Sequence, residues 1–375
     1  MPKPLPPTPI TGLNRRHILA ALGGALIATS RAFAAPSPEL FSQRLQQLDQ
    51  DGRINGLHSV LVSQNNSLVF EHYGRGEDET ESWGRFGSVT FAPDVPHDLR
   101  SVSKSIVGLA YGIALAAGKV PPPEAKLYDQ FPEYPDLAGQ PGRDWITIHH
   151  VLSMTLGFDW DELTIPYGAD LRNSEIAMEA APDRFRFILE RPIIGEPGVK
   201  WSYCGGATAL LGRLIEKGTG EDLLSYCRRV LFDPLGFGPV VWHKGNDGAY
   251  RAASGLRLLP RDMLKVGQLM LARGAWNGRE MVPTDWVKRV ITPVVALADG
   301  RRYGYQWYLG ANLVGTPPQR CDWVGGIGWG GQRLHVYPKL DLVVAMNCGN
   351  YDKSGIEQTR VVNAVLTEVV LPGFI

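Results

Sequence analysis

Hydrophobic and polar positions change their pattern several times along the chain. Apolar and polar residues alternate over His58–Ser63 and Leu68–His72, on either side of the turn-forming pair Asn65-Asn66. This alternation predicts two antiparallel strands joined as a hairpin. They follow a short amphipathic stretch over Pro38–Leu48, so the folded part of the chain is expected to begin with antiparallel sheet.

The middle of the chain has a helical pattern. Residues Ser101–Ala117 are apolar nearly all round, which predicts a helix that is buried on every side. Thr147 is expected to cap one of the helices that follow, and Gly218 to stop another. These predicted helices cover Ile148–Leu156, Asp183–Glu190, Ala207–Lys217 and Leu223–Leu231. Residues 121–142 begin with three prolines and are expected to form a surface loop.

The last third mixes both patterns. Helices are predicted over Arg261–Ala272 and Gly355–Val370, and a turn at Asn277-Gly278. Between them, strands are predicted over Tyr303–Leu309, Gln332–Tyr337 and Leu342–Asn347, and a turn over residues 338–341 joins the last two. The order of sheet, helices and sheet predicts an α/β (α+β) fold. Its α/β part would cover about residues 35–95 and 245–375, its all-α part about residues 96–244, and a cleft would lie between them.

The first 34 residues have the pattern of an export signal. Arg15-Arg16 precede an apolar run over Ile18–Ala28 and the small-residue sequence Ala32-Phe33-Ala34. The run is about half the roughly 20 residues that a membrane-spanning helix needs. We therefore expect residues 1–34 to be a twin-arginine signal peptide, recognised by the Tat export machinery, and residues 35–375 to be the mature periplasmic or secreted bacterial protein.

Charge and cysteine content limit the partners and disulfides to be expected. Residues 1–34 hold four basic residues and no acidic one, so 34 basic and 38 acidic residues remain beyond them. This balance gives no reason to expect nucleic acid or an anionic membrane surface as a partner. The chain has four cysteines, Cys204, Cys227, Cys321 and Cys348, which are expected to be mostly free and buried. A disulfide between Cys321 and Cys348 is the alternative.

The strongest chemical signal is Ser101-Val102-Ser103-Lys104. A serine and a lysine three residues apart share one face of a helix, so Lys104 can serve as a base for a Ser101 nucleophile. A lysine one turn into an apolar helix is also unusual, because charged groups are seldom buried without a partner. The start of a helix offers Ser101 an unpaired backbone N–H as one half of an oxyanion hole. The alternative is a snorkelling lysine beside a helix-capping serine.

Two further segments carry candidate chemistry. Tyr203 precedes a predicted helix, and its phenol could relay a proton, although a lone tyrosine is more often a packing residue. The segment Gly328-Trp329-Gly330-Gly331-Gln332 leads into a strand, where glycines allow the backbone to approach a ligand, although a bulged edge strand has the same pattern. The histidines lack the spacing of a metal site, so neither a metal nor a cofactor is expected.

Taken in order, these motifs resemble those of serine hydrolases built like class C β-lactamases and penicillin-binding proteins, including family VIII carboxylesterases and 6-aminohexanoate-dimer hydrolases. The resemblance implies a β-lactamase/transpeptidase-like fold, with an antiparallel sheet flanked by helices and an all-α subdomain. It also implies that Ser101 is acylated, that Lys104 and Tyr203 share proton transfer, and that the backbone N–H of Gln332 completes the oxyanion hole. Trp329, Gly330 and Gly331 would border the substrate.

Two departures from the family pattern bear on the substrate. The second motif is usually Tyr-x-Asn, but residue 205 is glycine, and Trp329 stands where β-lactamases have Lys or His. An aromatic wall favours uncharged or apolar acyl groups. We therefore expect hydrolysis of small esters or linear amides. Alternatives are a D-amino-acid peptidase, transpeptidase or β-lactamase acting on cell-wall-like substrates, and a catalytically silent ligand-binding protein of the same fold.

Overall fold

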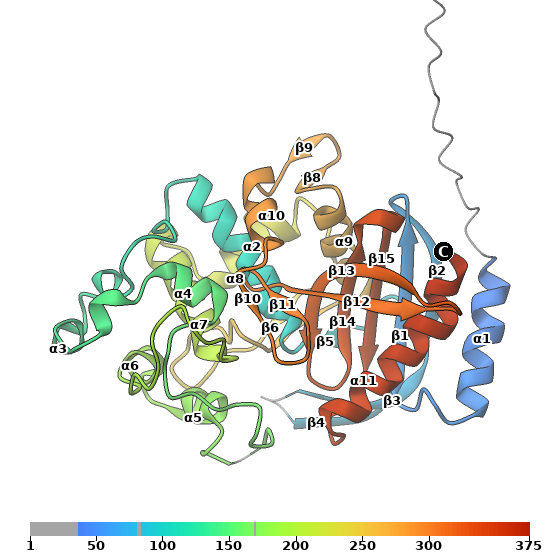
Figure 1. The fold of residues 1–375 in the computed structure, drawn as a ribbon, viewed down its shortest axis with the longest axis horizontal. Helices are drawn as coiled ribbons and strands as arrows, with labels where there is room; N and C mark the ends of the chain where they lie inside the picture. Colours follow the sequence, from blue (N-terminus) through green and yellow to red (C-terminus); the bar gives the residue numbers. More distant parts are fainter. Residues whose placement is uncertain (1–36, 81–83, 169) are drawn as a thin grey trace, which may run out of the picture. The chain divides into compact units, whose positions relative to one another are not determined.

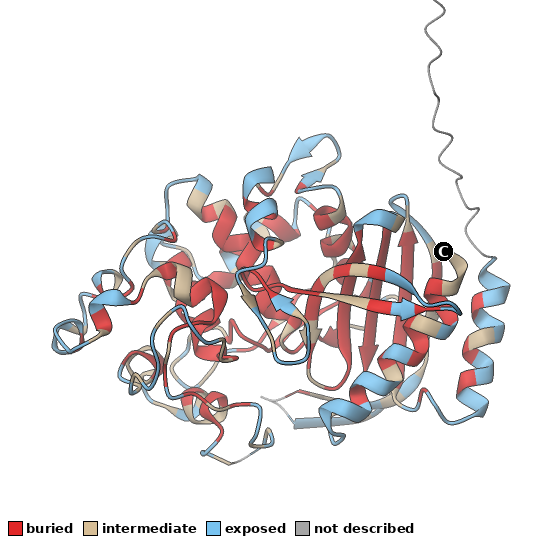
Figure 2. Cartoon of the chain, in the orientation of Figure 1, coloured by how far each residue is buried: buried red, intermediate tan, exposed pale blue. Residues whose placement is uncertain are grey.

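An eight-stranded antiparallel sheet organises the computed structural model, which describes residues 37–80, 84–168 and 170–375 (Figure 1). In spatial order the strands are β10 (Val295–Ala296), β11 (Arg302–Tyr303), β12 (Tyr308–Val314), β13 (Gln319–Gly328), β14 (Gln332–Tyr337), β15 (Leu342–Cys348), β1 (Leu57–Gln64) and β2 (Ser67–Tyr73). The central strands β14 and β15 are buried along their whole length (Figure 2).

Smaller strand groups lie beside this sheet. They are the pair β3 (Arg75–Thr80) and β4 (Gly84–Thr90), the group β5 (His97–Asp98), β7 (Leu256–Leu258) and β6 (Val241–Trp242), and the pair β8 (Ala275–Trp276) and β9 (Arg279–Glu280). The pattern of the sequence did not predict β3 and β4, because their residues are mostly polar and glycine. The expected turn at Asn277-Gly278 is confirmed, since it joins β8 to β9.

Helices account for most of the middle of the chain. The α-helices are α1 (Pro38–Gln50), α2 (Val102–Ala116), α3 (Pro135–Ala138), α4 (Ile148–Ser153), α5 (Ser174–Ala180), α6 (Arg184–Leu189), α7 (Gly205–Thr219), α8 (Leu223–Cys227), α9 (Pro260–Leu271), α10 (Thr284–Val290) and α11 (Gly355–Ala364). Helices α8 and α11 continue as the π-helical segments Arg228–Phe232 and Val365–Val370. None of the helices in the described ranges is both long and apolar enough to cross a membrane.

The packing of the helices follows from where their apolar residues lie. Helix α9 packs against β14, β15 and β1, whereas α11 lies in front of the sheet in the view of Figure 1. Helix α2 contacts both α7 and strand β13, which places it between the helical region and the sheet. Twelve of its residues are buried, as the all-round apolar pattern predicts. One hydrophobic core therefore runs from the sheet into the helical region.

The N-terminal hairpin is confirmed. Strands β1 and β2 pair in antiparallel fashion, and the turn residues Asn65 and Asn66 have φ angles of 48° and 61°. Asparagine tolerates this left-handed conformation better than most residues do. The predicted export signal over residues 1–34 lies outside the described residues.

Several predicted boundaries are wrong. The helix predicted over Ile148–Leu156 ends at Ser153, because Met154 adopts a φ of 57°, and the predicted loop over residues 121–142 contains helix α3. Helix α7 does not stop at Gly218 but runs to Thr219 and is capped by Gly220, whose φ is 73°. Gly218 has a different role, because a Cβ there would lie 1.7 Å from the Lys119 carbonyl oxygen. The strand predicted over Tyr303–Leu309 is broken into β11 and β12, since Gln306 adopts a φ of 63° and donates its backbone N–H to Leu152.

A pair of buried histidines links β1 to β5. His58 Nδ1 and His97 Nε2 are 2.9 Å apart, and His97 Nδ1 lies 2.8 Å from the Asp98 carbonyl oxygen. Because a carbonyl only accepts, His97 carries its proton on Nδ1 and receives a hydrogen bond from His58. Burial lowers the pKa of both imidazoles to about 3, and the neighbouring His97 adds to this effect at His58. Both rings are therefore neutral in the folded protein near pH 7.

This pair predicts acid-sensitive stability. In the unfolded chain the imidazoles bind protons near their ordinary pKa of about 6.5, whereas the folded protein resists protonation down to about pH 3. The stability associated with the neutral rings is present above about pH 6.5 and is lost as the pH falls toward 3. Between pH 7 and pH 5, the Tm of the wild type should therefore fall further than that of a His58→Gln/His97→Gln variant. Equal falls in thermal melts would contradict this account.

Candidate active site

Ser101 lies at the point where α2 begins against strand β13. A Cβ on Gly326 would lie 3.1 Å from Val102 Cγ1, and a Cβ on Gly328 would lie 2.6 Å from the Leu99 carbonyl oxygen. Only glycine allows the strand to approach the first turn of the helix so closely. Ser101 is the N-cap residue of this helix, and the first N–H groups of a helix have no intrahelical acceptor. The Ser101 hydroxyl therefore sits where the dipole of the helix favours negative charge.

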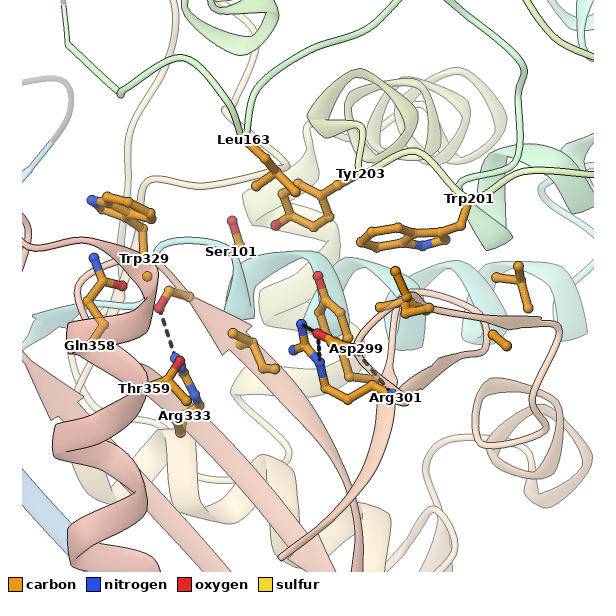
Figure 3. Close-up of a pocket in the computed structure, with 18 of the residues that line it drawn as sticks. Ser101, Leu163, Trp201, Tyr203, Asp299, Arg301, Trp329, Arg333, Gln358 and Thr359 are labelled. Atoms are coloured by element: carbon orange, nitrogen blue, oxygen red, sulfur yellow. Dashed lines mark hydrogen bonds and ion pairs between the residues drawn. The ribbon is translucent and has the colours of Figure 1, made fainter.

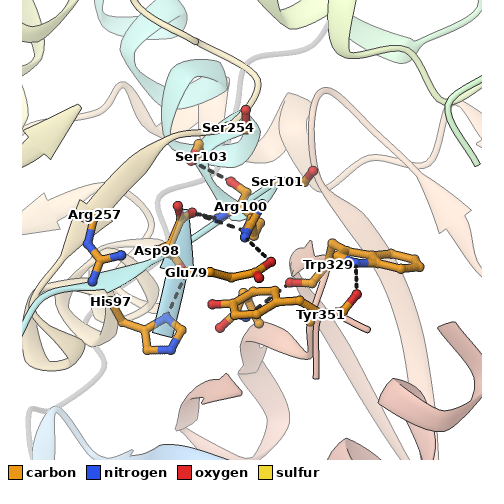
Figure 4. A network of polar contacts seen from close by, with 12 residues as sticks. Glu79, His97, Asp98, Arg100, Ser101, Ser103, Ser254, Arg257, Trp329 and Tyr351 are labelled. Carbon is orange, nitrogen blue, oxygen red and sulfur yellow. Dashed lines mark hydrogen bonds and ion pairs between the residues drawn. The ribbon is translucent and has the colours of Figure 1, made fainter. Parts of the chain in front are cut away.

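A strained residue precedes the serine (Figure 4). Arg100 has a φ of 47°, in the left-handed region. Its N–H donates to Asp98 Oδ1 at 2.8 Å, and Ser103 Oγ donates to its carbonyl oxygen at 2.6 Å. The Arg100 guanidinium donates to Glu79 Oε1 at 3.2 Å and lies 4.4 Å from the centre of the Tyr351 ring. These contacts hold a conformation that costs about 1–3 kcal/mol and thereby fix the start of α2.

Lys104 is buried beside Ser101, with a relative exposure of 2%. Its Nζ donates to Ser101 Oγ and to the Ala253 carbonyl oxygen, each at 3.0 Å. The predicted pairing of serine and lysine on one helix face is therefore present. The sequence did not reveal that the backbone of Ala253 holds the lysine.

Tyr203 joins the same cluster from the residues that precede α7. Figure 3 shows the Tyr203 and Ser101 hydroxyls converging at the edge of the cavity. Lys104 Nζ lies 4.8 Å from the centre of the Tyr203 ring. Burial raises the pKa of the phenol well above its ordinary value, and the hydrogen bond with Ser101 partly opposes this rise. Tyr203 is thus a neutral proton donor or relay near pH 7.

A cavity of about 620 Å³ opens in front of Ser101 (Figure 3). This volume suits a small molecule. Its walls come from the loop before α5, the segment before α7, the segment between α10 and β12, the turn between β13 and β14, and α11. The lining residues are Ser101, Leu163, Tyr167, Val199, Lys200, Trp201, Tyr203, Val295, Ala296, Leu297, Ala298, Asp299, Arg301, Tyr308, Ile327, Gly328, Trp329, Arg333, Gly355, Gln358 and Thr359.

Trp329 forms an aromatic wall of the cavity. From the sequence, this side chain is expected to border the substrate. Its Nε1 donates to the Tyr351 carbonyl oxygen at 2.9 Å, and its ring lies 5.4 Å from the ring of Tyr167, centre to centre. Because Arg100 stacks on Tyr351, the same residue supports both the wall of the cavity and the turn that carries Ser101.

The rest of this glycine-rich segment has a different role from the one expected. A Cβ on Gly330 would lie 2.5 Å from the Tyr351 ring, and a Cβ on Gly331 would lie 2.8 Å from Cys348 Cβ. Both residues also have positive φ angles, 85° and 104°. Their missing side chains thus make room for neighbouring protein atoms, and neither residue lines the cavity.

Gln332 does not line the cavity either. Its buried side chain donates to the carbonyl oxygens of Trp329, at 3.1 Å, and Cys348, at 2.6 Å. The oxyanion role expected of its backbone N–H stays a prediction. The residues of this region that line the cavity are Ile327, Gly328 and Trp329. They share the cavity with Ser101, so the glycine-rich segment reaches the site at the end of β13.

Two buried acids that the sequence did not single out stand behind Tyr203. Glu162, with 1% exposure, accepts hydrogen bonds at Oε2 from Gly205 N–H at 2.7 Å and from Trp160 Nε1 at 2.6 Å. A Cβ on Gly205 would lie 3.1 Å from both Glu162 Oε2 and Glu175 Cδ. The two carboxyl groups therefore occupy the space beside residue 205, where the family pattern has asparagine.

The two acids influence each other. Burial, together with the neighbouring Glu175, raises the pKa of Glu162 to about 8, while Lys104 and the hydrogen bond from Gly205 oppose this rise. Two carboxylates at such close range in a buried site disfavour double ionisation. The pair therefore holds a proton near pH 7, within electrostatic reach of Lys104 and Tyr203.

Other residues considered from the sequence have structural roles. Ser105 Oγ donates to the Gln306 carbonyl oxygen, and His150 completes the capping box of α4 with Thr147. His149 Nδ1 lies 2.6 Å from the Tyr305 hydroxyl. The four cysteines are free and buried, so Cys321 and Cys348 are not bridged.

Most of the chain has known relatives. Residues 41–365 match the Beta-lactamase family. A 6-aminohexanoate-dimer hydrolase from Paenarthrobacter ureafaciens is 26% identical over 345 residues, covering 84% of this chain and 76% of that protein.

Solved structures show the same architecture. A Bacillus anthracis protein provisionally named a 6-aminohexanoate-dimer hydrolase superposes with a TM-score of 0.68 at 18% identity, covering 86% of this chain and 79% of that one. EstCE1, described as a hydrolase with promiscuous acyltransferase activity, superposes with a TM-score of 0.64 at 14% identity, covering 88% and 99%. These likenesses confirm the predicted β-lactamase/transpeptidase-like fold.

The buried acid pair predicts a feature of the pH profile. Above about pH 8, Glu162 ionises behind Tyr203, and its negative charge would disfavour an oxyanion that forms next to Ser101. For a hydrolysable ester, kcat/KM should therefore fall through an apparent pKa near 8. Glu162→Gln, which keeps an acceptor for Gly205 and Trp160, should lack this fall.

The matched control is Glu216→Gln. Burial also raises the pKa of Glu216, which lies near the opposite end of α7 and does not line the cavity. Its replacement should leave the fall near pH 8 in place. A Glu162→Gln profile that matches the wild-type profile would show that the ionisation of this carboxyl does not affect turnover.

Proposed function

The chain belongs to the beta-lactamase family, and within this family we propose that it is a serine hydrolase that cleaves small esters or linear amides through an acyl-serine intermediate. The observation that carries this proposal is the cluster of Ser101, Lys104 and Tyr203 at the edge of the cavity, with Lys104 Nζ 3.0 Å from Ser101 Oγ. The relative named 6-aminohexanoate-dimer hydrolase and the neighbour described as a hydrolase with promiscuous acyltransferase activity support a hydrolase that transfers an acyl group.

The reaction would proceed in two halves. Ser101 Oγ bonds to the acyl carbon as its proton moves to Lys104 Nζ, and the carbonyl oxygen becomes an oxyanion near the Ser101 N–H and the backbone at Gly328–Trp329. The bond to the leaving group then breaks, and the leaving alcohol or amine takes a proton through Tyr203. Water attacks the acyl-serine, releases the carboxylic acid and restores the Ser101 hydroxyl.

The surroundings of residue 205 favour this substrate class over β-lactams and cell-wall peptides. The space that an asparagine side chain would need is filled by Glu162 and Glu175. Trp329 supplies an apolar surface where a cationic residue would hold a β-lactam carboxylate. A D-amino-acid peptidase, a transpeptidase, a β-lactamase and a silent binding protein of this fold are the competing functions.

The decisive experiment uses purified residues 35–375 with p-nitrophenyl butyrate, a chromogenic cephalosporin and a phosphonylating probe. Ester turnover and covalent labelling should be present in the wild type and abolished in Ser101→Ala, because the nucleophile is removed. Lys104→Ala and Tyr203→Phe should slow acylation by on the order of 100-fold or more while the fold is retained.

Ser105→Ala serves as the control, since Ser105 only hydrogen-bonds the backbone of Gln306 and should retain labelling. Cephalosporin turnover without ester turnover would favour a β-lactamase. Absence of both labelling and turnover would leave the silent binding protein as the better account.

We infer that the enzyme works outside the cytoplasm of a bacterium. The support is the pattern Arg15-Arg16 ahead of an apolar run. Expressed as the full chain, the protein should be recovered from the periplasm or the medium, and an Arg15→Lys/Arg16→Lys variant should stay in the cytoplasm. Cell fractionation tests this, and the same distribution for both proteins would contradict a twin-arginine signal.

A further inference from the structure

A second cavity, which we call the Trp145 pocket, lies beside the segment that leads to Tyr203. It has a volume of about 550 Å³ and is lined by Gly142, Trp145, His150, Ile193, Gly195, Glu196 and Pro197, none of which lines the Ser101 cavity. The Trp145 side chain is 73% exposed, although indoles are mostly buried. A large aromatic ring that is open to solvent inside a cavity is typical of a ligand site.

The walls of the Trp145 pocket are fastened to the residues behind them. The buried guanidinium of Arg143, two residues before Trp145, donates from Nη2 to the Glu190 carbonyl oxygen at 3.3 Å. On the other wall, the Gly195 N–H donates to the Gly157 carbonyl oxygen at 3.1 Å. A Cβ on Gly157 would lie 2.3 Å from the Gly195 carbonyl oxygen, so only glycine allows this approach. The pocket is therefore preformed.

His150 presents a hydrogen-bond donor to this pocket. The backbone N–H of Thr147 donates to His150 Nδ1 at 3.1 Å, so the proton of the neutral ring lies on Nε2. Burial lowers the pKa of His150 to about 4, and the neighbouring His149 adds to this effect, so the ring is neutral near pH 7. Within the described part of the chain, the side-chain hydrogen bonds of His150 use Nδ1 alone. The Nε2–H group is therefore left for a ligand.

The Trp145 pocket and the Ser101 cavity are walled by one stretch of backbone. Pro197 lines the pocket, whereas Val199 and Trp201 line the cavity. The Cα atoms of residues 197 and 199 are at most about 7 Å apart, because they are separated by two residues. Val199 is 66% exposed, so an apolar side chain lies at the solvent side of the cavity, next to the pocket. A linear molecule can follow this surface from one cavity to the other.

The layout of the Ser101 cavity indicates which part of a substrate would take this route. The rings of Trp201 and Tyr203 lie 5.8 Å apart, centre to centre. In the view of Figure 3, Trp201 and Trp329 lie on opposite sides of Ser101. In the mechanism proposed above, the leaving group takes its proton through Tyr203. The leaving group would therefore extend toward Trp201 and the Trp145 pocket.

We propose that the Trp145 pocket is an accessory binding site for the far end of an extended leaving group, and that this end is an aromatic or apolar group with an uncharged hydrogen-bond acceptor. The proposal rests on the function proposed above and narrows its substrates to esters or amides of long alcohols or amines. Trp145 offers a stacking surface and Ile193 an apolar wall, while His150 Nε2 donates to the acceptor. The carboxylate of Glu196 disfavours an anion at this position.

Three butyrate esters test this proposal. Ethyl butyrate has no distal group, 8-phenyloctyl butyrate carries a distal phenyl ring, and 8-oxo-8-phenyloctyl butyrate carries the same ring next to a carbonyl group. Titration of the butyric acid released, at ester concentrations below aggregation, gives kcat/KM. The wild type should favour the ketone ester over ethyl butyrate by about tenfold or more, and Trp145→Ala should reduce this ratio by about tenfold.

A second variant separates the hydrogen bond from the apolar contact. His150→Glu keeps an acceptor for the Thr147 N–H, as in other capping boxes, but has no donor. It should lose the preference for the ketone ester over the phenyl ester. Leu313→Ala is the matched control, because Leu313 is 62% exposed and lines neither cavity, and it should keep both preferences.

General damage to the enzyme gives a different result from loss of the accessory site. If Trp145→Ala lowered the turnover of all three esters alike, the ratios would stay unchanged, and the proposal would be overturned. An equal preference for the ketone ester in His150→Glu and the wild type would overturn the assignment of His150 as the donor.

A binding measurement applies even if no ester is hydrolysed. Calorimetry on Ser101→Ala should detect binding of 8-hydroxy-1-phenyloctan-1-one, the alcohol of the ketone ester, and Ser101→Ala/Trp145→Ala should lose it. Ester turnover that depends on Ser101, without any effect of Trp145 in either assay, would overturn the accessory site alone. Binding that depends on Trp145, without turnover or probe labelling, would overturn the hydrolase and keep the pocket as a ligand site.

Discussion

The arrangement of the site depends on how closely the first turn of α2 can lie against strand β13. Gly326 and Gly328 remove the side chains that would otherwise push the helix away from the strand. The approach brings the N-terminal N–H groups of the helix, the hydroxyl of Ser101 and the end of β13 to one edge of the cavity. The strained backbone of Arg100, held by Asp98 and by stacking on Tyr351, fixes the same turn from the other side.

The site collects ionisable groups that would be unstable apart. Lys104 is buried against a hydroxyl and a carbonyl oxygen, Glu162 and Glu175 crowd each other behind Tyr203, and Arg333 lacks a carboxylate among the described residues. Each arrangement favours one protonation state. In a medium of low dielectric these interactions are stronger than in water, so each charge near the cavity has a large effect on its neighbours.

Much of the site could be predicted because its signals are local. Ser101 and Lys104 are three residues apart on one helix, and Trp329 follows directly on a strand. The contacts of the Gln332 side chain could not be predicted, because they depend on which side of the turn faces the cavity and on its hydrogen bonds to β15. For a similar reason, the sequence did not single out Glu162 or Arg333 as residues near the cavity. A glutamate in a loop and an arginine in a strand look ordinary until their neighbours are known.

The sequence by itself determined the elements whose physics is periodic or local. The hairpin around Asn65-Asn66 and the buried helix α2 follow from alternation, turn chemistry and an apolar surface on all sides. Only the tertiary structure decided which glycines permit close packing, where the segment Tyr303–Leu309 breaks, and which charged side chains share the cavity. Those outcomes depend on contacts between residues far apart in the chain, and neither composition nor spacing encodes such contacts directly.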